Sequence, residues 1–231
     1  MIKKILIIIF VITCAIQFIG CGGLIGNKSV PPLEGYSKIL IAPFNIKNPT
    51  DVKYDELPTM ISYSAGTKLD LRFTEKKWFF DQSREVKPVS DKMKELSISK
   101  QDVFENADAA VKLAQAFEAD IVIVGLMNEP KFTIERSGKI EYDMKDVSGT
   151  GAARYYAVYQ TATLRTKVKV IEMSSGKVIW DGDVVGYKKY KTRYRTGETE
   201  KSQREDTMAA DVRKDFVDAF VAKLYPEQVA K

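Results

Sequence analysis

The stretch KVKVIEMSSGKVIWDGDV, residues 167–184, predicts a β-hairpin and decides the fold class. Polar and apolar side chains alternate from Thr161 to Met173, as they do in a strand with one buried face. Residues 174–177 (SSGK) supply turn chemistry, with Gly176 where a positive φ is needed. The chain then returns from Val178 to Tyr187 with a second set of apolar residues. We therefore expect an antiparallel strand pair here.

Strands and helices alternate on the N-terminal side of this hairpin. Short apolar runs predict buried strands at Lys38–Ile46 and Ile121–Met127, and an aromatic strand at Trp78–Phe80. Asp55-Glu56-Leu57-Pro58 predicts the start of a helix, because Pro is favoured near the first helical position. The polar segment 87–97 is interpreted as a connector. The apolar stripe of that first helix consists of Leu57, Ile61, Ala65 and Leu69.

Two more helices complete the pattern. Ser99 and Asp102 have the spacing of a capping box and predict a helix start. The C-terminal segment Asp206–Leu224 predicts an amphipathic helix that Pro226 ends. The apolar side of the first of these helices contains Val103, Ala107, Val111, Ala114 and Phe117. That of the second contains Val212, Phe216, Phe220 and Leu224, with Val217 and Val221 beside them.

This order of elements predicts an α/β (α+β) sandwich: a mixed β-sheet with a long antiparallel hairpin, flanked by helices. A doubly wound nucleotide fold is not indicated, because no G-x-G-x-x-G follows a strand and the chain has no P-loop motif. Lys131–Asp146 also alternates, with Phe132, Ile134, Ile140, Tyr142 and Met144 on one face across a Ser137-Gly138 turn. We interpret it as a surface hairpin, since its strands are shorter than the ~9–11 residues of a membrane hairpin.

The first 20 residues, MIKKILIIIFVITCAIQFIG, resemble a bacterial lipoprotein signal peptide. Lys3 and Lys4 precede an uncharged apolar run, and Gly20 stands directly before Cys21. We expect cleavage after Gly20 and acylation of Cys21, with an uncleaved helix and ordinary secretion as the alternatives. The resemblance extends to Gly22, which in such lipoproteins favours the outer membrane. We therefore expect an outer-membrane anchor that faces the periplasm.

The expected domain organisation follows from this signal. Residues 1–20 form the signal peptide, and 21–36 the lipidated N-terminus and a flexible, Gly- and Pro-containing tether. Residues 37–226 form a single α/β domain, and 227–231 a C-terminal tail.

The composition of the chain limits its chemistry. The chain has no His and two Cys, Cys14 and Cys21, which excludes Ser-His-Asp and Cys-His catalysis and every His-containing metal site. Cys14 is removed with the signal peptide and Cys21 is used for the lipid. We therefore predict no catalytic residues, no metal and no cofactor. The net charge of +5 is too mild to indicate nucleic acid, and the export signal argues against it.

Carboxylates are the main catalytic groups that this composition leaves. Glu141 and Asp143, and likewise Asp181 and Asp183, lie two residues apart on predicted strands, which places each pair on one face. Surface strands often carry such acidic pairs, so a structural role on the surface is the favoured interpretation, with carboxylate-dependent hydrolysis of cell-wall glycan as the alternative. Ser174–Lys177 could form a Ser/Lys nucleophile pair, but its position in a tight turn favours turn chemistry.

Residues 186–195 (GYKKYKTRYR) interleave aromatic and basic side chains. We take this segment as a candidate interaction surface for an envelope component. The alternative is a solvated strand whose lysines protect a sheet edge. The candidate residues are Tyr187, Lys188, Lys189, Tyr190, Lys191, Arg193, Tyr194 and Arg195.

Several of these elements together resemble a known family. They are the strand and turn at Ile39–Thr50, the aromatic strand at Lys77–Phe80, FEADIVIVG at 117–125, and the hairpin at 167–184. The chain is similar to envelope lipoproteins that include the penicillin-binding-protein activator lipoprotein B and the curli secretion channel lipoprotein, with a core like the N-terminal domain of TolB. The resemblance covers roughly Lys38 to Tyr225.

The resemblance implies a non-enzymatic, membrane-tethered module that acts by contact with an envelope protein. In one branch of the family the contact is with a cell-wall synthase. In the other branch the protein oligomerises into a secretion channel, which residues 151–170 faintly resemble. We therefore expect a lipid-anchored protein that assembles or regulates an envelope machine. An oligomeric outer-membrane secretion-channel subunit is the alternative.

Overall fold

The computed structural model describes residues 32–49, 54–143, 153–197, 199 and 205–225. All of them belong to the compact unit Pro31–Lys231, and the unit Met1–Val30 lies outside the described residues. The predicted signal peptide, Gly20 and Cys21 therefore lie outside them as well. Near the start of the described chain, Leu33 is fully buried in the core, and the Tyr36 hydroxyl donates a hydrogen bond to Glu172 (2.9 Å).

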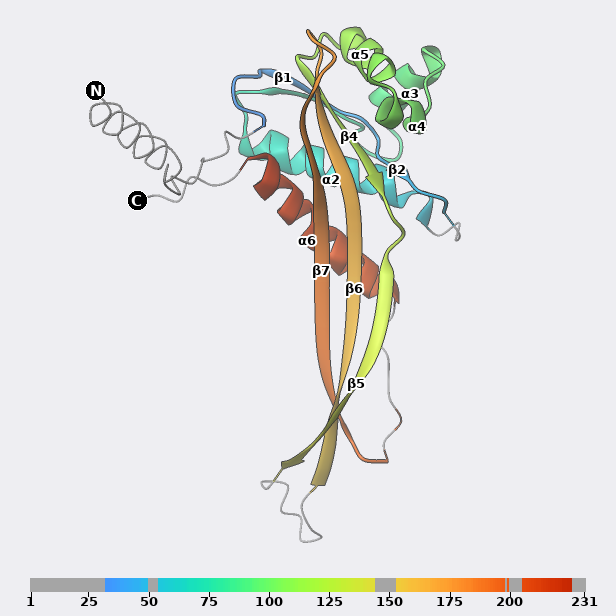
Figure 1. Cartoon of the computed structure of the whole chain (residues 1–231), viewed down its shortest axis with the longest axis vertical. Helices are drawn as coiled ribbons and strands as arrows, with labels where there is room; N and C mark the ends of the chain where they lie inside the picture. The colour runs from blue at the N-terminus through green and yellow to red at the C-terminus, as the bar shows by residue number, and fades with distance from the viewer. Residues whose placement is uncertain (1–31, 50–53, 144–152, 198, 200–204, 226–231) are drawn as a thin grey trace, which may run out of the picture. The chain divides into compact units, whose positions relative to one another are not determined.

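The sheet has seven strands among the described residues, and β6 (Ala153–Glu172) lies at its centre (Figure 1). One edge of β6 pairs antiparallel with β4 (Ile121–Met127) and, further along, with β5 (Lys131–Asp143). The other edge of β6 pairs antiparallel with β7 (Val178–Arg195). The remaining strands are parallel to β4 or to one another: β1 (Lys38–Ile41), β2 (Asn45–Ile46) and β3 (Lys77–Phe79).

Helices cover both faces of this mixed sheet. On one face, α2 (Leu57–Arg72) and α6 (Glu205–Leu224) pack on a core that includes Ile39 and Ile41. The other face carries a second core, around Leu40 and Val122, under three short helices: α3 (Pro88–Glu95), α4 (Lys100–Glu105) and α5 (Ala107–Ala116). Burial of each large apolar side chain stabilises the fold by roughly 1.5–3 kcal/mol. The predicted α/β sandwich is confirmed.

Gly186 allows α6 to approach β7 closely. A Cβ atom at this position would lie 2.6 Å from the carbonyl oxygen of Val212 and 2.8 Å from the amide nitrogen of Phe216. No side chain fits in that space, so glycine is required for the contact between helix and strand. The predicted apolar stripe of α6 is confirmed, because Val212, Phe216 and Phe220 are fully or almost fully buried.

Side chains of α6 also bond to the main chain of β7. Among the described residues β7 pairs with one strand, β6, so its other edge faces away from the sheet. The amide of Tyr187 donates to the Asp215 carboxylate (2.8 Å), and Lys223 Nζ donates to the carbonyl of Asp183 (2.9 Å). Two main-chain groups of an edge strand, which could otherwise pair with another chain, thus have partners in α6.

The predictions for the middle helices were partly wrong. The segment 87–97 is not a connector, because Pro88–Glu95 forms α3. The residue at the N-cap position of α3, Lys87, makes no capping hydrogen bond with its side chain. Instead, the buried Asp81 carboxylate accepts hydrogen bonds from the amides of Val89 (2.9 Å) and Ser90 (3.0 Å), and so caps the start of α3. The capping box of Ser99 and Asp102 is confirmed.

The helix predicted after Ser99 is in fact two helices. α4 ends at Glu105 and α5 begins at Ala107. The side chain of Asn106 accepts a hydrogen bond from the amide of Asp108 (2.9 Å), which makes it the N-cap of α5. Of the predicted apolar side, Val103 and Ala114 are buried, whereas Ala107, Val111 and Phe117 are half-buried.

The predicted hairpin at 131–146 is a single strand. β5 pairs with β6 on both sides of Ser137-Gly138, and the register shifts between Arg136 and Ile140. Residues 137–139 are therefore accommodated as a bulge rather than a turn. The prediction that Phe132, Ile134 and Ile140 share one face is consistent with this register. Met144 lies outside the described residues.

The main hairpin is confirmed and is longer than predicted. β6 and β7 pair from Ile171 and Val178 at the turn to Tyr155 and Arg195 at the far end. Gly176 has the expected positive φ of 65°. Among the helices that the structure describes, none is long and apolar enough to cross a membrane.

Candidate interaction surface on the β5–β7 ribbon

Three antiparallel strands form a long ribbon, and its far end continues past the helices (Figure 1). We define the ribbon as β5 with residues 153–165 of β6 and 185–195 of β7. The predicted surface residues all lie in its β7 strand. Successive side chains of a strand point to opposite faces, so the ribbon has one face toward α6 and one outer face.

The predicted set divides between these two faces. Even-numbered residues of β7 share the face of Val184 and Gly186, which contacts α6. Lys188, Tyr190 and Tyr194 therefore lie on the α6 face. The other five candidates lie together on the outer face: Tyr187, Lys189, Lys191, Arg193 and Arg195.

The two tyrosines of the α6 face have structural contacts. The Tyr190 hydroxyl donates a hydrogen bond to the Asp211 carboxylate of α6. Burial, together with this hydrogen bond and the charge of Asp211, raises the pKa of Tyr190 to about 12. Tyr194 is buried and lies beside Tyr156 of β6, with 6.0 Å between ring centroids. These side chains hold the strand to its neighbours.

On the outer face, basic side chains of β7 lie over aromatic rings of β6. Lys189 Nζ is 4.3 Å from the centroid of the Tyr159 ring, and Arg193 Cζ is 5.1 Å from that of Tyr155. Both pairs have the geometry of cation–π interactions, which contribute about 0.5–1 kcal/mol at exposed sites. We call Tyr155, Tyr159, Tyr187, Lys189, Lys191, Arg193 and Arg195 the aromatic–basic face.

Glu141 of β5 joins two of these cations. Its carboxylate oxygens lie 3.3 Å from Lys191 Nζ and 3.0 Å from Arg193 Nε. The pairs are about half exposed, so their effect is mainly to orient the cations rather than to stabilise the fold. Tyr187 is 50% exposed, with no ring or carboxylate contact of its side chain among the described residues.

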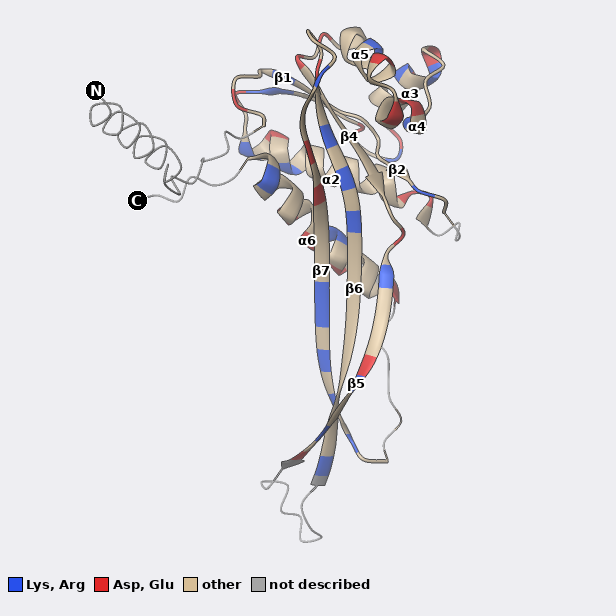
Figure 2. Ribbon diagram, in the orientation of Figure 1, with Lys and Arg blue, Asp and Glu red and all other residues tan. Residues whose placement is uncertain are grey.

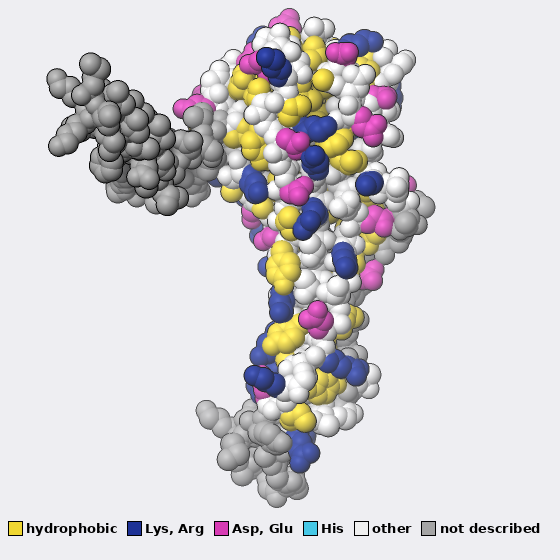
Figure 3. All heavy atoms as spheres, viewed as in Figure 1, with side chains coloured by type: hydrophobic (Ala, Val, Ile, Leu, Met, Phe, Trp, Pro, Cys, Tyr) yellow, Lys and Arg dark blue, Asp and Glu magenta, His cyan; other side chains and the backbone are white. Residues whose placement is uncertain are grey.

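This arrangement presents an ordered set of rings and charges to solvent. Lys and Arg recur along β6 and β7 (Figure 2), and hydrophobic and basic side chains alternate over the lower part of the ribbon (Figure 3). Tyr and Arg are the residue types most often found at the energetic centres of protein interfaces. Held on strands, they lose little conformational freedom on binding. The face is therefore suited to contact a partner with acidic groups.

Sequence reasoning missed Tyr155, Tyr159 and Glu141 as members of this face. The two tyrosines lie four residues apart in RYYAVYQ, residues 154–160, a spacing that places them on one side of a strand. Their link to β7 depends on register, since Tyr155 pairs with Arg195 and Tyr159 with Lys191. The alternation was visible in the sequence, whereas the register was not.

The other candidate constellations occupy surface positions. Asp181 pairs with Lys167 (3.3 Å), and Glu141 pairs with the two cations above, whereas the side chain of Asp143 lies outside the described part. In the turn, Ser175 donates a hydrogen bond to Glu172 (2.6 Å), and this bond and that from Tyr36 lower the pKa of Glu172. Within the described chain, no three metal-ligating side chains gather.

No protein-family model matches the chain, and no curated protein sequence matches it. Among solved structures, lipoprotein GNA1162 from Neisseria meningitidis is similar, with 14% identity and a TM-score of 0.39 over 80% of this chain and 98% of that one.

Two further structures are similar to this chain. The LpoB C-terminal domain from Escherichia coli has 14% identity and a TM-score of 0.34 over 69% of this chain and 87% of that one. The PelC dodecamer from Paraburkholderia phytofirmans has 10% identity and a TM-score of 0.35 over 83% and 89%. The resemblance stated from the sequence is thus confirmed as a structural similarity to envelope lipoproteins at low sequence identity.

Proposed function

We propose that this chain is a lipid-anchored protein of the bacterial cell envelope that acts without catalysis, by contact with another protein. It would be held at the outer membrane through Cys21, facing the periplasm, and would assemble or regulate a machine of cell-wall synthesis or secretion. The observation that carries the contact proposal is the aromatic–basic face, which lies on the side of the ribbon opposite to α6.

Two properties of this face support a role in contact. Its cations are oriented by neighbouring rings and by Glu141, which reduces the conformational entropy lost when a partner binds. Its aromatic residue Tyr187 remains half exposed on the outer face, whereas Val184, three residues earlier in the same strand, is buried on the α6 face. The surface that folding leaves uncovered is thus available to a partner with complementary negative charge.

The anchor is tested by replacing Cys21. We expect the Cys21→Ala variant to be recovered in the soluble periplasmic fraction, and the wild type with membranes, because acyl chains are what hold the domain there. A Cys14→Ala variant, which changes a cysteine of the predicted signal peptide, is the matched control and should fractionate as wild type. The anchor is disproved if Cys21→Ala stays in the membrane fraction.

The contact is tested by photo-crosslinking in living cells. A photoreactive amino acid in place of Tyr187 should give a discrete adduct with a different envelope protein. The same residue at Leu71, which is 76% exposed on α2, is the control and should give none. Lys189→Ala with Lys191→Ala should weaken the Tyr187 adduct. Equal adducts from both positions, or none from Tyr187, would argue against this face.

The same experiment distinguishes the alternatives. A channel subunit predicts that Tyr187 crosslinks to other copies of this chain and yields a series of multiples of its mass. A carboxylate-dependent hydrolase predicts cell-wall glycan cleavage that Asp181→Asn or Glu141→Gln abolishes. Both carboxylates are paired with basic side chains on the surface, which favours the contact proposal over hydrolysis.

A further inference from the structure

A second site lies in the body of the molecule, where the strands β1 and β3 end. These strands are parallel neighbours, with Leu40 opposite Phe79. After β1 the chain passes through the short strand β2 to α2, which packs on the core of Ile39 and Ile41. After β3 it continues to α3, which packs on the opposite core. Neighbouring parallel strands thus send their helices to opposite faces, and in open α/β sheets such points are where ligands bind.

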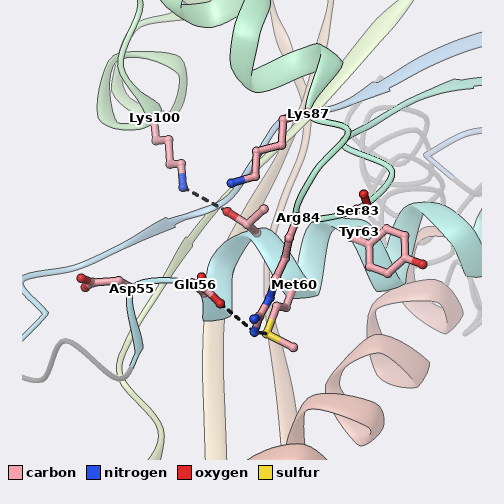
Figure 4. A pocket seen from close by; sticks show the side chains of 9 residues that line it. Asp55, Glu56, Met60, Tyr63, Ser83, Arg84, Lys87 and Lys100 are labelled. Carbon is pink, nitrogen blue, oxygen red and sulfur yellow. Dashed lines mark hydrogen bonds and ion pairs between the residues drawn. The ribbon is translucent and has the colours of Figure 1, made fainter.

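The structure has a cavity at this point (Figure 4). Its volume is about 190 Å³, less than the roughly 300–1,000 Å³ of pockets for drug-sized ligands, so it suits a small group. One wall comes from the start of α2, the other from the β3–α3 connection and the start of α4. The lining residues are Asp55, Glu56, Thr59, Met60, Tyr63, Ser83, Arg84, Lys87 and Lys100.

The cations of this cavity are not all neutralised. Arg84 is 2.7 Å from the Glu56 carboxylate. Lys87 and Lys100 are half-buried and point toward the first turn of α2, and no carboxylate of the described residues lies within ion-pair distance of either. Lys100 Nζ donates a hydrogen bond to Thr59 Oγ1 (3.3 Å). Two ammonium groups therefore face one small space.

Two nearby carboxylates, Asp81 and Asp55, offset part of this charge. Asp81 approaches Lys100, but its carboxylate is buried and accepts the amides of Val89 and Ser90 at the start of α3. Burial lowers the pKa of Lys100, and the charge of Lys87 adds to this effect, whereas Asp81 and Asp55 oppose it. An anion between the two lysines would relieve their repulsion.

One hydroxyl group lies beside the two ammonium groups. Thr59 Oγ1 accepts a hydrogen bond from Lys100 and keeps its own proton, which it can donate to an anion. Ser83 also lines the cavity, but it lies beside Tyr63, apart from the ends of the two lysines (Figure 4). Two cations and a hydroxyl donor around one space are groups that bind a tetrahedral oxyanion.

We propose that this cavity binds a phosphate monoester between Lys87 and Lys100, with Thr59 as an additional donor. A phosphate monoester carries about −1.5 to −2 charges at pH 7, which matches the two unpaired ammonium charges better than a single carboxylate does. The phosphate could belong to a soluble metabolite or to a lipid headgroup, since both present the same group. This site is separate from the aromatic–basic face and does not depend on the function proposed for it.

The test is calorimetric titration of the full chain in detergent at constant ionic strength. The probes are inorganic phosphate, glycerol 3-phosphate and dihexanoyl phosphatidic acid. We expect saturable binding of at least one probe, and Lys87→Gln with Lys100→Gln should weaken it by about tenfold or more. The matched control, Lys92→Gln with Lys112→Gln, removes the same charge from α3 and α5 outside the cavity and should bind as wild type.

The outcomes distinguish the two sources of the phosphate from each other and from the failure of the proposal. Binding of the two soluble probes indicates a metabolite, and binding of the acyl-bearing probe alone indicates a lipid headgroup. The double variant Lys87→Arg with Lys100→Arg keeps both charges and should retain binding. If the double Gln variant does not fold, the single variant Lys87→Gln replaces it in the titration. The proposal is overturned if no probe saturates the wild type, or if the control variant loses as much affinity as the cavity variant.

Discussion

The body of the molecule and its ribbon are built from one sheet but are covered differently. In the body, helices lie on both faces, and strands such as β4 are buried on both sides. In the ribbon, α6 lies along one face, and the outer face exposes Tyr187 and the basic residues around it. The identity of a body residue is therefore set by packing, whereas packing does not account for the residues of the outer face.

The largest expected effect comes from the body. Phe216→Ala removes a fully buried ring between α6 and the sheet and should lower the free energy of unfolding by about 3–5 kcal/mol. Tyr187→Ala, on the outer face of the ribbon, should change it by about 0.5 kcal/mol or less. Denaturant unfolding of both variants measures the contrast. Similar losses at the two positions would show that the outer face contributes to folding.

An intermediate effect is expected where the two regions join. Gly186→Ala places a Cβ atom 2.6 Å from the Val212 carbonyl oxygen, so α6 must shift, at a cost of about 1–3 kcal/mol. Gly138→Ala, in the β5 bulge, is the control, because a Cβ atom there meets nothing within 4 Å. Thermal unfolding should separate them. If both variants have the same midpoint, the close approach of α6 to β7 is not required.

A smaller effect than that of Gly186→Ala is expected from a hydrogen bond between the ribbon and α6. Tyr190→Phe removes the hydrogen bond to Asp211 and should cost about 0.5–1.5 kcal/mol at neutral pH. The pKa of Tyr190 is raised to about 12 in the folded protein, against about 10 for an unperturbed tyrosine. The fold therefore favours the neutral phenol. This contribution is complete below pH 10 and is lost as pH rises through 12.

Unfolding of wild type and Tyr190→Phe at a series of pH values measures this contribution as a difference. The titration of groups common to both proteins cancels in the difference between their free energies of unfolding. This difference should therefore shrink between about pH 10 and pH 12. A difference that stays constant through this range would show that the phenol does not titrate with the raised pKa.

Local patterns were sufficient to predict most of the body. Residues 99–102 contain both partners of the capping box, and the stripe of α6 repeats at helical spacing, so both predictions were confirmed. α3 was missed because the carboxylate that caps it, Asp81, lies seven residues before the helix. A contact between separate segments leaves no periodic pattern within the helix itself.

The ribbon shows where sequence reasoning ends. The run of Tyr, Lys and Arg in β7 was visible in the sequence. Its division between two faces was not, because it depends on whether the odd- or the even-numbered residues contact α6. The contact of Gly186 with α6 shows that the even-numbered residues do. The β5 bulge was read as a turn because Ser137-Gly138 is a common turn dipeptide. Its pairing partner lies in β6, after residues 144–152, and only the register excludes the turn.

The bonds from Asp215 and Lys223 to the edge of β7 have a consequence for biosynthesis. Synthesis and export both proceed from the N-terminus, so β5, β6 and β7 emerge before α6, and the hairpin can form while α6 is still absent. During that interval the main chain of Asp183 and Tyr187 is open to any strand in reach, including one from a neighbouring nascent chain. A product that terminates before Glu205 would keep this edge permanently, and we expect it to depend on chaperones and to aggregate.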